Sequence, residues 1–156
     1  CLSLILRQQP VASDLRQVST ALKVVTDLER IGDHASDIAE LILRIKSEHA
    51  YHIVKHLPVM AASAGRMVHD AIEAFIDQDL DAAMEIIDRD DEVDTLFNQV
   101  KEDVIHLLKS SPDQADQGID LLMVAKYLER IGDHAVNVCE WTQFSKTGAL
   151  KNVRIM

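Results

Sequence analysis

The chain has little of what breaks or cross-links a polypeptide: 5 glycines, 3 prolines and 2 cysteines in 156 residues, with 4% aromatic residues. Cys1 and Cys139 stand near opposite ends, so they make no disulfide framework and suggest a reducing compartment, which we expect to be the cytoplasm. Leucine, isoleucine, valine, alanine and acidic residues fill the long stretches between the few glycines and prolines. This composition favours helices.

Two further absences concern partners. The net charge is −10 and no stripe of lysine or arginine exists, so nucleic acid is not an expected partner, whereas cations or basic surfaces are attracted. The longest apolar runs, such as IDLLMVA, are far too short to cross a bilayer, so we expect contact with a membrane only through partners. The chain opens on CLSLILR, which we interpret as the tail of a helix that starts upstream of a truncation.

The hydrophobic pattern is helical throughout, and no segment has the period of a strand. We predict helices over about 14–48, 58–78, 81–109 and 117–144. Ser13 is the expected N-cap of the first helix, and Pro58 suits the first turn of the second. Residues 49–56 form a predicted junction whose histidines, at 49, 52 and 56, could line one helical face around a metal. A polar connector is the favoured interpretation.

One phrase occurs twice: LERIGDHA covers residues 28–35 and again 128–135. A proline-containing loop precedes the long helix that bears it in both places. In the second copy two further helices stand before that loop, whereas only a stub, 1–9, remains of them in the first. We therefore predict an all-α fold of antiparallel three-helix-bundle repeats. Residues 1–50 are the back part of one repeat, 57–144 are a complete second repeat, and 145–156 are a tail.

Acidic residues form a row on each repeated helix. With 100° between successive residues, the four members of each row fall within an arc of about 80°, on the side opposite the apolar residues of the first helix. Like charges at this spacing destabilise a bare helix, so an ordinary solvated face is a poor explanation. The rows are Glu29, Asp33, Asp37 and Glu40 in the first copy, and Glu129, Asp133, Asn137 and Glu140 in the second.

A third acidic pair, Asp90 and Asp94, lies in the apolar stripe of its helix, so we predict that both side chains point into the core. A buried carboxylate must be neutralised, paired or bound to a metal. Antiparallel packing would bring the pair against Glu129 and Asp133, with no obvious lysine partner. This all-oxygen set predicts a site for a hard cation such as Mg, Mn or Fe. The alternative is a solvated acidic face.

Three other residue types in these helices have structural interpretations. Gly32 and Gly132 are expected where another helix crosses closely, because glycine inside a helix costs about 1 kcal/mol against alanine. His34 and His134 lie away from the acidic rows, and they either form interhelical hydrogen bonds or simply pack. Cys139 is expected to be packed.

The segments DLERIGDHASDIAE (27–40) and YLERIGDHAVNVCEW (127–141) resemble the two signature helices of the PhoU family of phosphate-uptake regulators. IDRDDEVDTLF (87–97) resembles the other acidic motif of that family. The resemblance implies an all-helical cytoplasmic regulator that is not an enzyme. It also implies partners: the ATPase subunit of a phosphate ABC transporter and a phosphate-sensing histidine kinase, both restrained when phosphate is plentiful.

The same resemblance implies multinuclear metal clusters, iron first, with manganese, magnesium, zinc or nickel as alternatives. One cluster would use Glu29, Asp33 and Asp37, and the other Glu129 and Asp133 facing Asp90 and Asp94. Asn137 replaces an acid, so its carbonyl oxygen can coordinate with one charge fewer. The first site lacks the helix that would carry its facing acids. Apolar surface left bare there predicts a homodimer or higher self-association.

Two other functions stay open. A di-iron-carboxylate enzyme needs Glu-x-x-His on two helices. Neither repeated phrase contains it, and the nearest pair, Asp103 and His106, lacks the glutamate. No Ser/His/Asp or Cys/His arrangement with a catalytic spacing can be proposed. The third possibility is a purely structural helical module that binds no metal.

Overall fold

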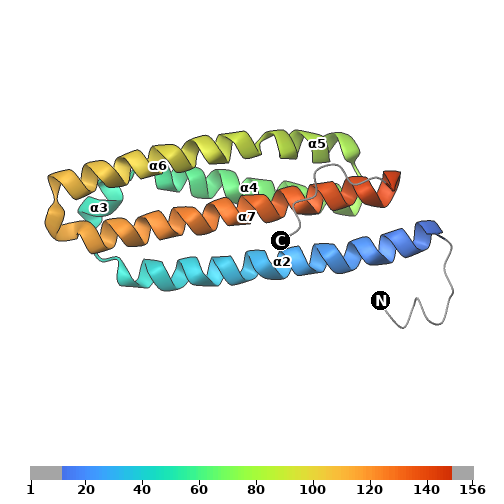
Figure 1. Ribbon diagram of the computed structural model, residues 1–156, viewed down its shortest axis with the longest axis horizontal. Helices are drawn as coiled ribbons and strands as arrows, with labels where there is room; N and C mark the ends of the chain where they lie inside the picture. The colour runs from blue at the N-terminus through green and yellow to red at the C-terminus, as the bar shows by residue number, and fades with distance from the viewer. Residues whose placement is uncertain (1–11, 149–156) are drawn as a thin grey trace.

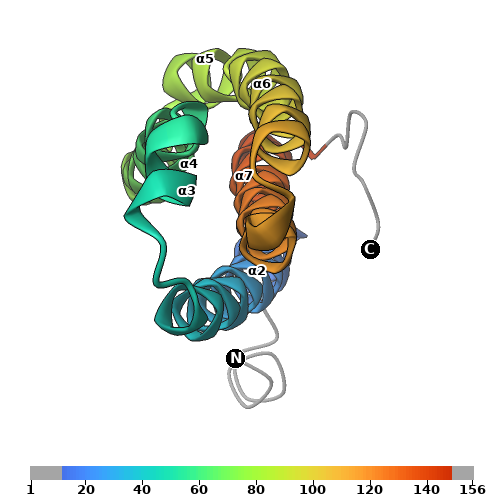
Figure 2. The same ribbon diagram turned by 90° about the vertical axis from the view of Figure 1, so that its left-hand side faces the viewer.

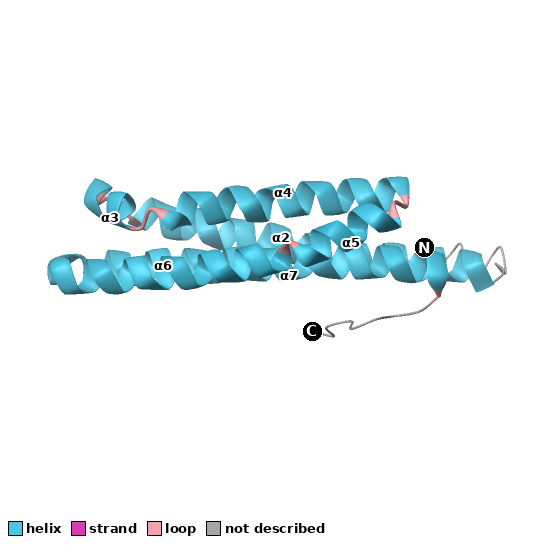
Figure 3. Cartoon of the chain, turned by 90° about the horizontal axis from the view of Figure 1, so that it is seen from above, coloured by secondary structure: helices cyan, strands magenta, loops and turns pink. Residues whose placement is uncertain are grey.

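The computed structural model describes residues 12–148 and confirms an all-α protein, with no strand among those residues (Figure 1). Figure 3 shows that short loops and turns join the helices. The elements are α2 (Ala12–Arg44), α3 (Glu48–Ile53), α4 (His56–Asp77), α5 (Leu80–Asp88), α6 (Asp90–Ser110), the 3₁₀ turn η1 (Pro112–Gln114) and α7 (Ala115–Thr147).

Helix α7 is the centre of the molecule, because it contacts α2, α4, α5 and α6. Figure 2, viewed along the helices, shows α7 between α6 and α2, with α4 across from it. Helices α4, α6 and α7 enclose a core that includes Met60, Met67, Val100, Leu107 and Leu121, each with 0% of its surface exposed. Helix α2 packs on the outer side of α7.

Helices α6 and α7 run antiparallel, as Figure 1 shows. Gly118, near the start of α7, lies against Leu107 at the end of α6. Gly132, further along α7, lies against Asp90 and Val93 at the start of α6. This register decides which carboxylates meet between the two helices.

The prediction of one helix over 81–109 is wrong, because Arg89 separates α5 from α6. The Arg89 N–H donates to Glu85 and Ile86, and its carbonyl accepts from Glu92. The first turn of α6 contains Asp90, Asp91 and Glu92. Acidic side chains stabilise a helix N-terminus, so this run favours the start of a new helix here.

The ends of the other helices also differ from the prediction by a few residues. Helix α2 already includes Ser13, the predicted N-cap, and ends at Arg44, because Ser47 caps the separate short helix α3. Pro58 lies in the first turn of α4, as predicted. Helix α7 continues to Thr147, so the start of the predicted tail is helical. The stub over 1–9 and most of that tail lie outside the described residues.

None of the described helices combines the length and the apolarity that a membrane span requires.

Candidate metal centre

The acidic row of α7 faces the start of α6. A Cβ atom placed on Gly132 would lie 3.6 Å from Asp90 Oδ1 and 3.6 Å from Val93 Cγ1. Asp90 therefore meets α7 between the sequence positions of Glu129 and Asp133. These two side chains are half-buried, as a helix–helix contact requires. The rest of the row, Asn137 and Glu140, is buried.

Asp90 and Asp94 do not share one environment. Asp90 is buried, with 9% of its surface exposed, as predicted. The prediction that Asp94 also points into the core is wrong, because Asp94 is exposed. The core stripe of α6 contains Val93, and Asp94 comes one residue later, about 100° further round the helix. Asp94 therefore lies outside the buried stripe of α6, which consists of Asp90, Val93, Leu96, Val100, Val104 and Leu107.

A lysine partner is present beside the row, contrary to the prediction. Lys126 Nζ lies 3.1 Å from Glu129 Oε1, one helical turn away on α7. The same ammonium lies 5.6 Å from the centre of the Phe97 ring on α6. A cation at Glu129 has to compete with Lys126 for this carboxylate. The pair is half-exposed, so the competition is weak.

The acidic row of α2 is mainly exposed, although Asp37 and Glu40 line a pocket together with Tyr127 of α7. Glu29, Asp33 and Glu40 are exposed and Asp37 is only half-buried. A Cβ on Gly32 would meet nothing within 4 Å among the described residues, so the close crossing predicted at Gly32 is wrong there, whereas it is confirmed at Gly132. The reason is tertiary: α4 and α6 cover this face of α7.

The contact between α2 and α7 uses His134 and also Asn137, a member of the α7 row. Asp27 Oδ1 lies 2.9 Å from His134 Nδ1 and accepts a hydrogen bond of 3.3 Å from Asn137 Nδ2. The His34 ring stacks on His134 at 5.6 Å and lies 5.5 Å from the Tyr127 ring. Of the two alternatives left open for His134, an interhelical hydrogen bond or simple packing, the structure has the hydrogen bond. For His34 the described contacts are these rings and Asp37.

Sequence reasoning missed Asp27 and Tyr127, although a signal was present. Position 27 precedes His34 by seven residues, and position 127 precedes His134 by seven, so each pair lies on one helical face. The two pairs then meet crosswise when the repeated helices pack. Position 27 is an aspartate, whereas the corresponding position 127 is a tyrosine. Asp27 is buried.

Burial and charge set the chemistry of two groups here. Burial, followed by the positive charges of His134 and Arg130, lowers the pKa of His34. Burial raises the pKa of the Cys139 thiol to about 12, so this packed cysteine is neither a thiolate nucleophile nor a ready metal ligand.

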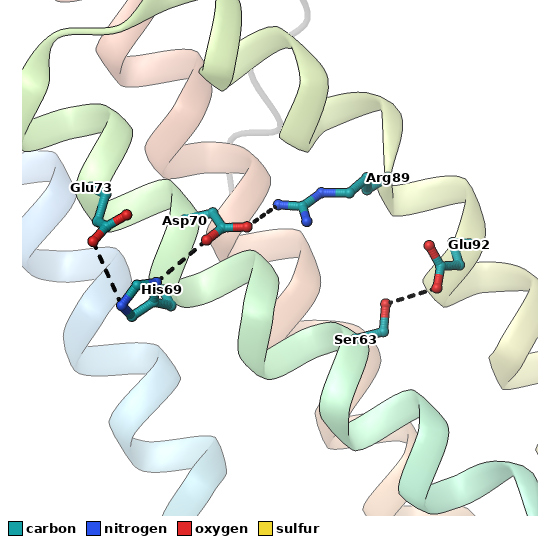
Figure 4. A network of polar contacts seen from close by, with 6 residues as sticks. All are labelled: Ser63, His69, Asp70, Glu73, Arg89 and Glu92. Atoms are coloured by element: carbon teal, nitrogen blue, oxygen red, sulfur yellow. Dashed lines mark hydrogen bonds and ion pairs between the residues drawn. The ribbon is translucent and has the colours of Figure 1, made fainter.

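A second polar network, which sequence reasoning also missed, joins α4 to the break before α6 (Figure 4). Arg89 Nη2 lies 2.6 Å from Asp70 Oδ2, and this hydrogen bond lowers the pKa of Asp70. His69 stands between Asp70, at 3.3 Å, and Glu73, at 3.7 Å. His69, Asp70 and Glu73 each offer one possible metal-ligand atom, and these atoms lie within 4.8 Å of one another. The group is on the surface, however, and Asp70 already forms an ion pair with Arg89.

Two of the three histidines of the junction have separate partners, which favours the polar connector. His49 Nε2 lies 3.1 Å from Ser111 Oγ, and His56 Nδ1 lies 2.7 Å from Asp103 Oδ2. Asp103 is therefore engaged with His56, on the far side of the α3–α4 junction. This contact also removes the pair that came nearest to a di-iron ligand motif, Asp103 and His106.

The donor chemistry between α6 and α7 fits a hard divalent cation. The acidic side chains brought to this contact offer only oxygen donors, and Asp90 is buried beside Gly132. Asn137 Oδ1 is buried and has no hydrogen-bond partner among the described residues, although the same amide contacts Asp27 on α2 through its Nδ2. Among the described residues the ligand atoms that converge within 4.8 Å belong to His69, Asp70 and Glu73, so Asp90, Glu129, Asp133 and Asn137 stay candidates on the contact of α6 with α7 at Gly132 and on their oxygen donors.

The fold defines the class of protein: an all-α bundle built on two copies of one carboxylate-bearing helix. Comparison identifies it further. The family model for the PhoU domain matches residues 1–42 and 57–142. The chain belongs to the PhoU family.

Individual relatives agree with this assignment. A phosphate-specific transport system accessory protein PhoU homolog of Clostridium acetobutylicum is 43% identical over 146 residues, covering 93% of this chain and 67% of the relative. The crystal structure of PhoU from Pseudomonas aeruginosa is similar with a TM-score of 0.85 at 31% identity, covering 96% of this chain and 72% of that one. PhoU from Streptococcus pneumoniae gives 0.81 at 30%, covering 97% and 69%.

Proposed function

We propose that this chain is an accessory protein of a phosphate-specific transport system and regulates phosphate uptake. The relatives carry that name, and their description as accessory proteins supports a regulator rather than an enzyme. In finer detail, the chain restrains the high-affinity phosphate ABC transporter through its ATPase subunit. It also restrains phosphate-starvation signalling through the sensor histidine kinase, on the cytoplasmic side of the membrane.

We also propose that a divalent cation binds between α6 and α7, with iron as the first candidate and Mn, Mg, Zn or Ni as alternatives. The observation that carries this proposal is the buried carboxylate of Asp90, held against Gly132 within the acidic row of α7. Glu129, Asp133 and the Asn137 oxygen are the residues that would complete the site. The cation supplies positive charge, which neutralises the acids and fixes α6 to α7.

Elemental analysis of the purified 156-residue chain tests the cation site. The wild type is expected to carry stoichiometric metal, and Asp90→Asn to lose it. The matched control is Asp91→Asn, which removes the same charge from an exposed position in the same helical turn. Metal-free wild type, or equal metal in both variants, contradicts the site and leaves a structural module. Oxidase activity of the loaded protein would favour the di-iron enzyme instead.

A reporter of phosphate-starvation gene expression tests the regulatory role. In a host that lacks its own PhoU relative, the wild type is expected to lower reporter output at high phosphate. Asp90→Asn is expected to lose this effect while Asp91→Asn retains it. Unchanged reporter output with the folded wild type contradicts the regulatory proposal.

Self-association stays a prediction, and exposed apolar side chains on α2 offer a surface for it. Leu43 is 79% exposed and Val25 is 61% exposed on the outward face of α2, beside Leu22. Light scattering on the protein as it elutes from a size-exclusion column measures its mass directly. A monomer at micromolar concentration contradicts the homodimer. Leu43→Gln with Val25→Gln is expected to lower the mass toward that of the monomer.

A further inference from the structure

Three side chains of α4 bring a nitrogen donor and two oxygen donors together, as Figure 4 shows. His69 Nδ1 lies 3.3 Å from Asp70 Oδ1, and His69 Nε2 lies 3.7 Å from Glu73 Oε1. The spacing along the helix supports the second contact, because residues four apart lie on one helical face, as His69 and Glu73 do. None of these residues belongs to the repeated helices or to the contact between α6 and α7.

The donor set on α4 differs in chemistry from the all-oxygen set at the start of α6. One imidazole nitrogen with two carboxylate oxygens suits a transition metal such as Zn²⁺, which binds these atoms at about 2.0–2.2 Å. Two ligand atoms of one tetrahedral Zn²⁺ ion therefore lie about 3.3 Å apart. The separations of 3.3 Å and 3.7 Å around His69 are close to that value.

Asp70 can act as a ligand although it is paired with Arg89. The ion pair uses Asp70 Oδ2, which lies 2.6 Å from Arg89 Nη2, whereas Oδ1 is the oxygen beside His69. The hydrogen bond from Arg89 also lowers the pKa of Asp70, so the carboxyl is ionised at neutral pH, as a metal ligand must be. Arg89 thus orients one ligand by holding the oxygen that the metal does not use.

The group can close around an ion, and an ion can reach it. The two carboxylates approach different nitrogens of the ring, so one of them has to move when an ion binds through a single nitrogen. The side chains of His69 and Glu73 are 70% and 64% exposed, so this movement disrupts no packing. Asp70 and Glu73 also line a cleft of about 430 Å³ beside α5, where further acids such as Asp77 and Glu85 attract cations.

We propose that His69, Asp70 and Glu73 form a binding site for a transition-metal ion of the zinc type on the surface of α4. The site is separate from the cation site proposed between α6 and α7 and uses none of its residues. Its ligands are exposed, so the ion exchanges with the solvent and is measured by titration rather than counted in the purified protein. A bound ion adds two positive charges to the acidic surface between α4 and α5.

Calorimetric titration of the full chain with Zn²⁺ tests this site. His69→Gln is the decisive variant, because it removes a ligand and no negative charge, and it is expected to raise the dissociation constant at least about tenfold. Glu73→Gln is expected to have a similar effect. Asp77→Asn is the matched control, since it removes one charge from the same cleft and lies outside the ligand group, and it is expected to stay within about twofold of the wild type.

Nuclear magnetic resonance of the imidazole ring protons gives a second readout. The signals of His69, identified by their loss in His69→Gln, are expected to shift on addition of one equivalent of Zn²⁺. Those of His52, which is also exposed, are expected to stay in place. Equal shifts of the two rings would show unspecific binding to surface histidines and would overturn the inference.

The variants also separate this site from its alternatives. If the acidic cleft only attracts cations diffusely, His69→Gln binds Zn²⁺ as tightly as the wild type and Asp77→Asn weakens binding as much as Glu73→Gln, which overturns the inference. Asp90→Asn is expected to keep the Zn²⁺ affinity of the α4 group. Zn²⁺ binding that Asp90→Asn abolishes and His69→Gln leaves intact overturns this inference while the proposed site between α6 and α7 stands.

Discussion

Asn137 stands where the first repeat has Asp37, and its surroundings explain the difference. Its Nδ2 donates to Asp27 Oδ1 at 3.3 Å across the α2–α7 contact, where both residues are buried. Position 127, the counterpart of Asp27, is a tyrosine, so Asp37 meets no equivalent acid from that position. An amide at 137 can donate to Asp27, which a carboxylate cannot.

Asn137→Asp is therefore expected to destabilise the chain by about 1–3 kcal/mol at pH 7, since two carboxylates would face each other away from water. Urea unfolding in the presence of a chelator measures this without help from a bound cation. Asp37→Asn is the control, because that side chain is half-exposed, and it is expected to stay within about 0.5 kcal/mol. Equal stability of the two variants contradicts this explanation of Asn137.

At the scale of the residue, His34 makes the stability of the fold depend on pH. Burial, then the charges of His134 and Arg130, hold its pKa below the ordinary 6.5, with Asp37 and Asp33 opposing. The folded chain thus binds this proton more weakly than the unfolded chain. The stabilising contribution is present above pH 6.5 and falls as the pH drops through 6.5 toward the lower folded pKa, after which it levels off.

His34→Gln is expected to reduce the loss of unfolding free energy between pH 7.5 and 5.5, measured by urea titrations at each pH. His52→Gln, at an exposed position, serves as the control. A slope that His34→Gln leaves unaltered contradicts the role assigned to this histidine.

At the scale of the element, the two copies of one octapeptide have different neighbours. A methyl group on Gly132 would stand 3.6 Å from Asp90 and Val93, which is ordinary contact, and one on Gly32 would meet nothing within 4 Å among the described residues. Alanine at either position is thus expected to stabilise its helix by about 0.5–1 kcal/mol. Leucine at 132 should force α6 from α7 and cost about 1–3 kcal/mol.

Thermal and urea unfolding of the four variants check this expectation. Gly32→Leu is the matched control for Gly132→Leu, because the same substitution enters the same octapeptide at an open face. Similar stability of the two leucine variants would show that α6 does not approach α7 closely at Gly132.

This octapeptide also shows how much of the structure could be predicted from the sequence. Periodicity and the doubled phrase predicted an all-α fold, the long helices and the acidic row of α7, because those features follow from local spacing. The burial of Gly132 and the exposure of Gly32 could not be read from LERIGDHA, since the letters are identical and only the covering helices differ. The break at Arg89 was hidden within a continuous apolar pattern. Asp94 is exposed because the buried stripe of α6 follows Val93, Leu96 and Val100.

The partners of the missed residues lie far away in sequence. Asp27 contacts His134 and Asn137, 107 and 110 positions later, and Asp70 contacts Arg89, 19 positions later. Residue type and helical face place such side chains on the correct side of a helix. The pairing itself depends on which helices become neighbours, and that depends on the packing of the whole bundle.

At the scale of the whole molecule, the helices differ in how many neighbours support them. Helix α7 packs against four other helices, whereas the extensive contact of α2 is with α7. Polar groups occupy the middle of that contact, at Asp27, His34, His134 and Asn137. Apolar side chains that are buried on α2, such as Val24 and Leu41, lie on either side of them along the helix.

This difference predicts an order of local opening. Amides of α2 are expected to exchange with deuterium at least about tenfold faster than those of α7, because opening α2 exposes less apolar surface than opening the bundle. Hydrogen-exchange mass spectrometry at neutral pH compares peptides from 14–44 with peptides from 115–147. Peptides of α4, which packs inside the bundle, are the internal control and should exchange at rates closer to those of α7. Protection of α2 equal to that of α7 would mean that the whole described chain opens as one cooperative unit, and that the single contact with α7 is as strong as the bundle itself.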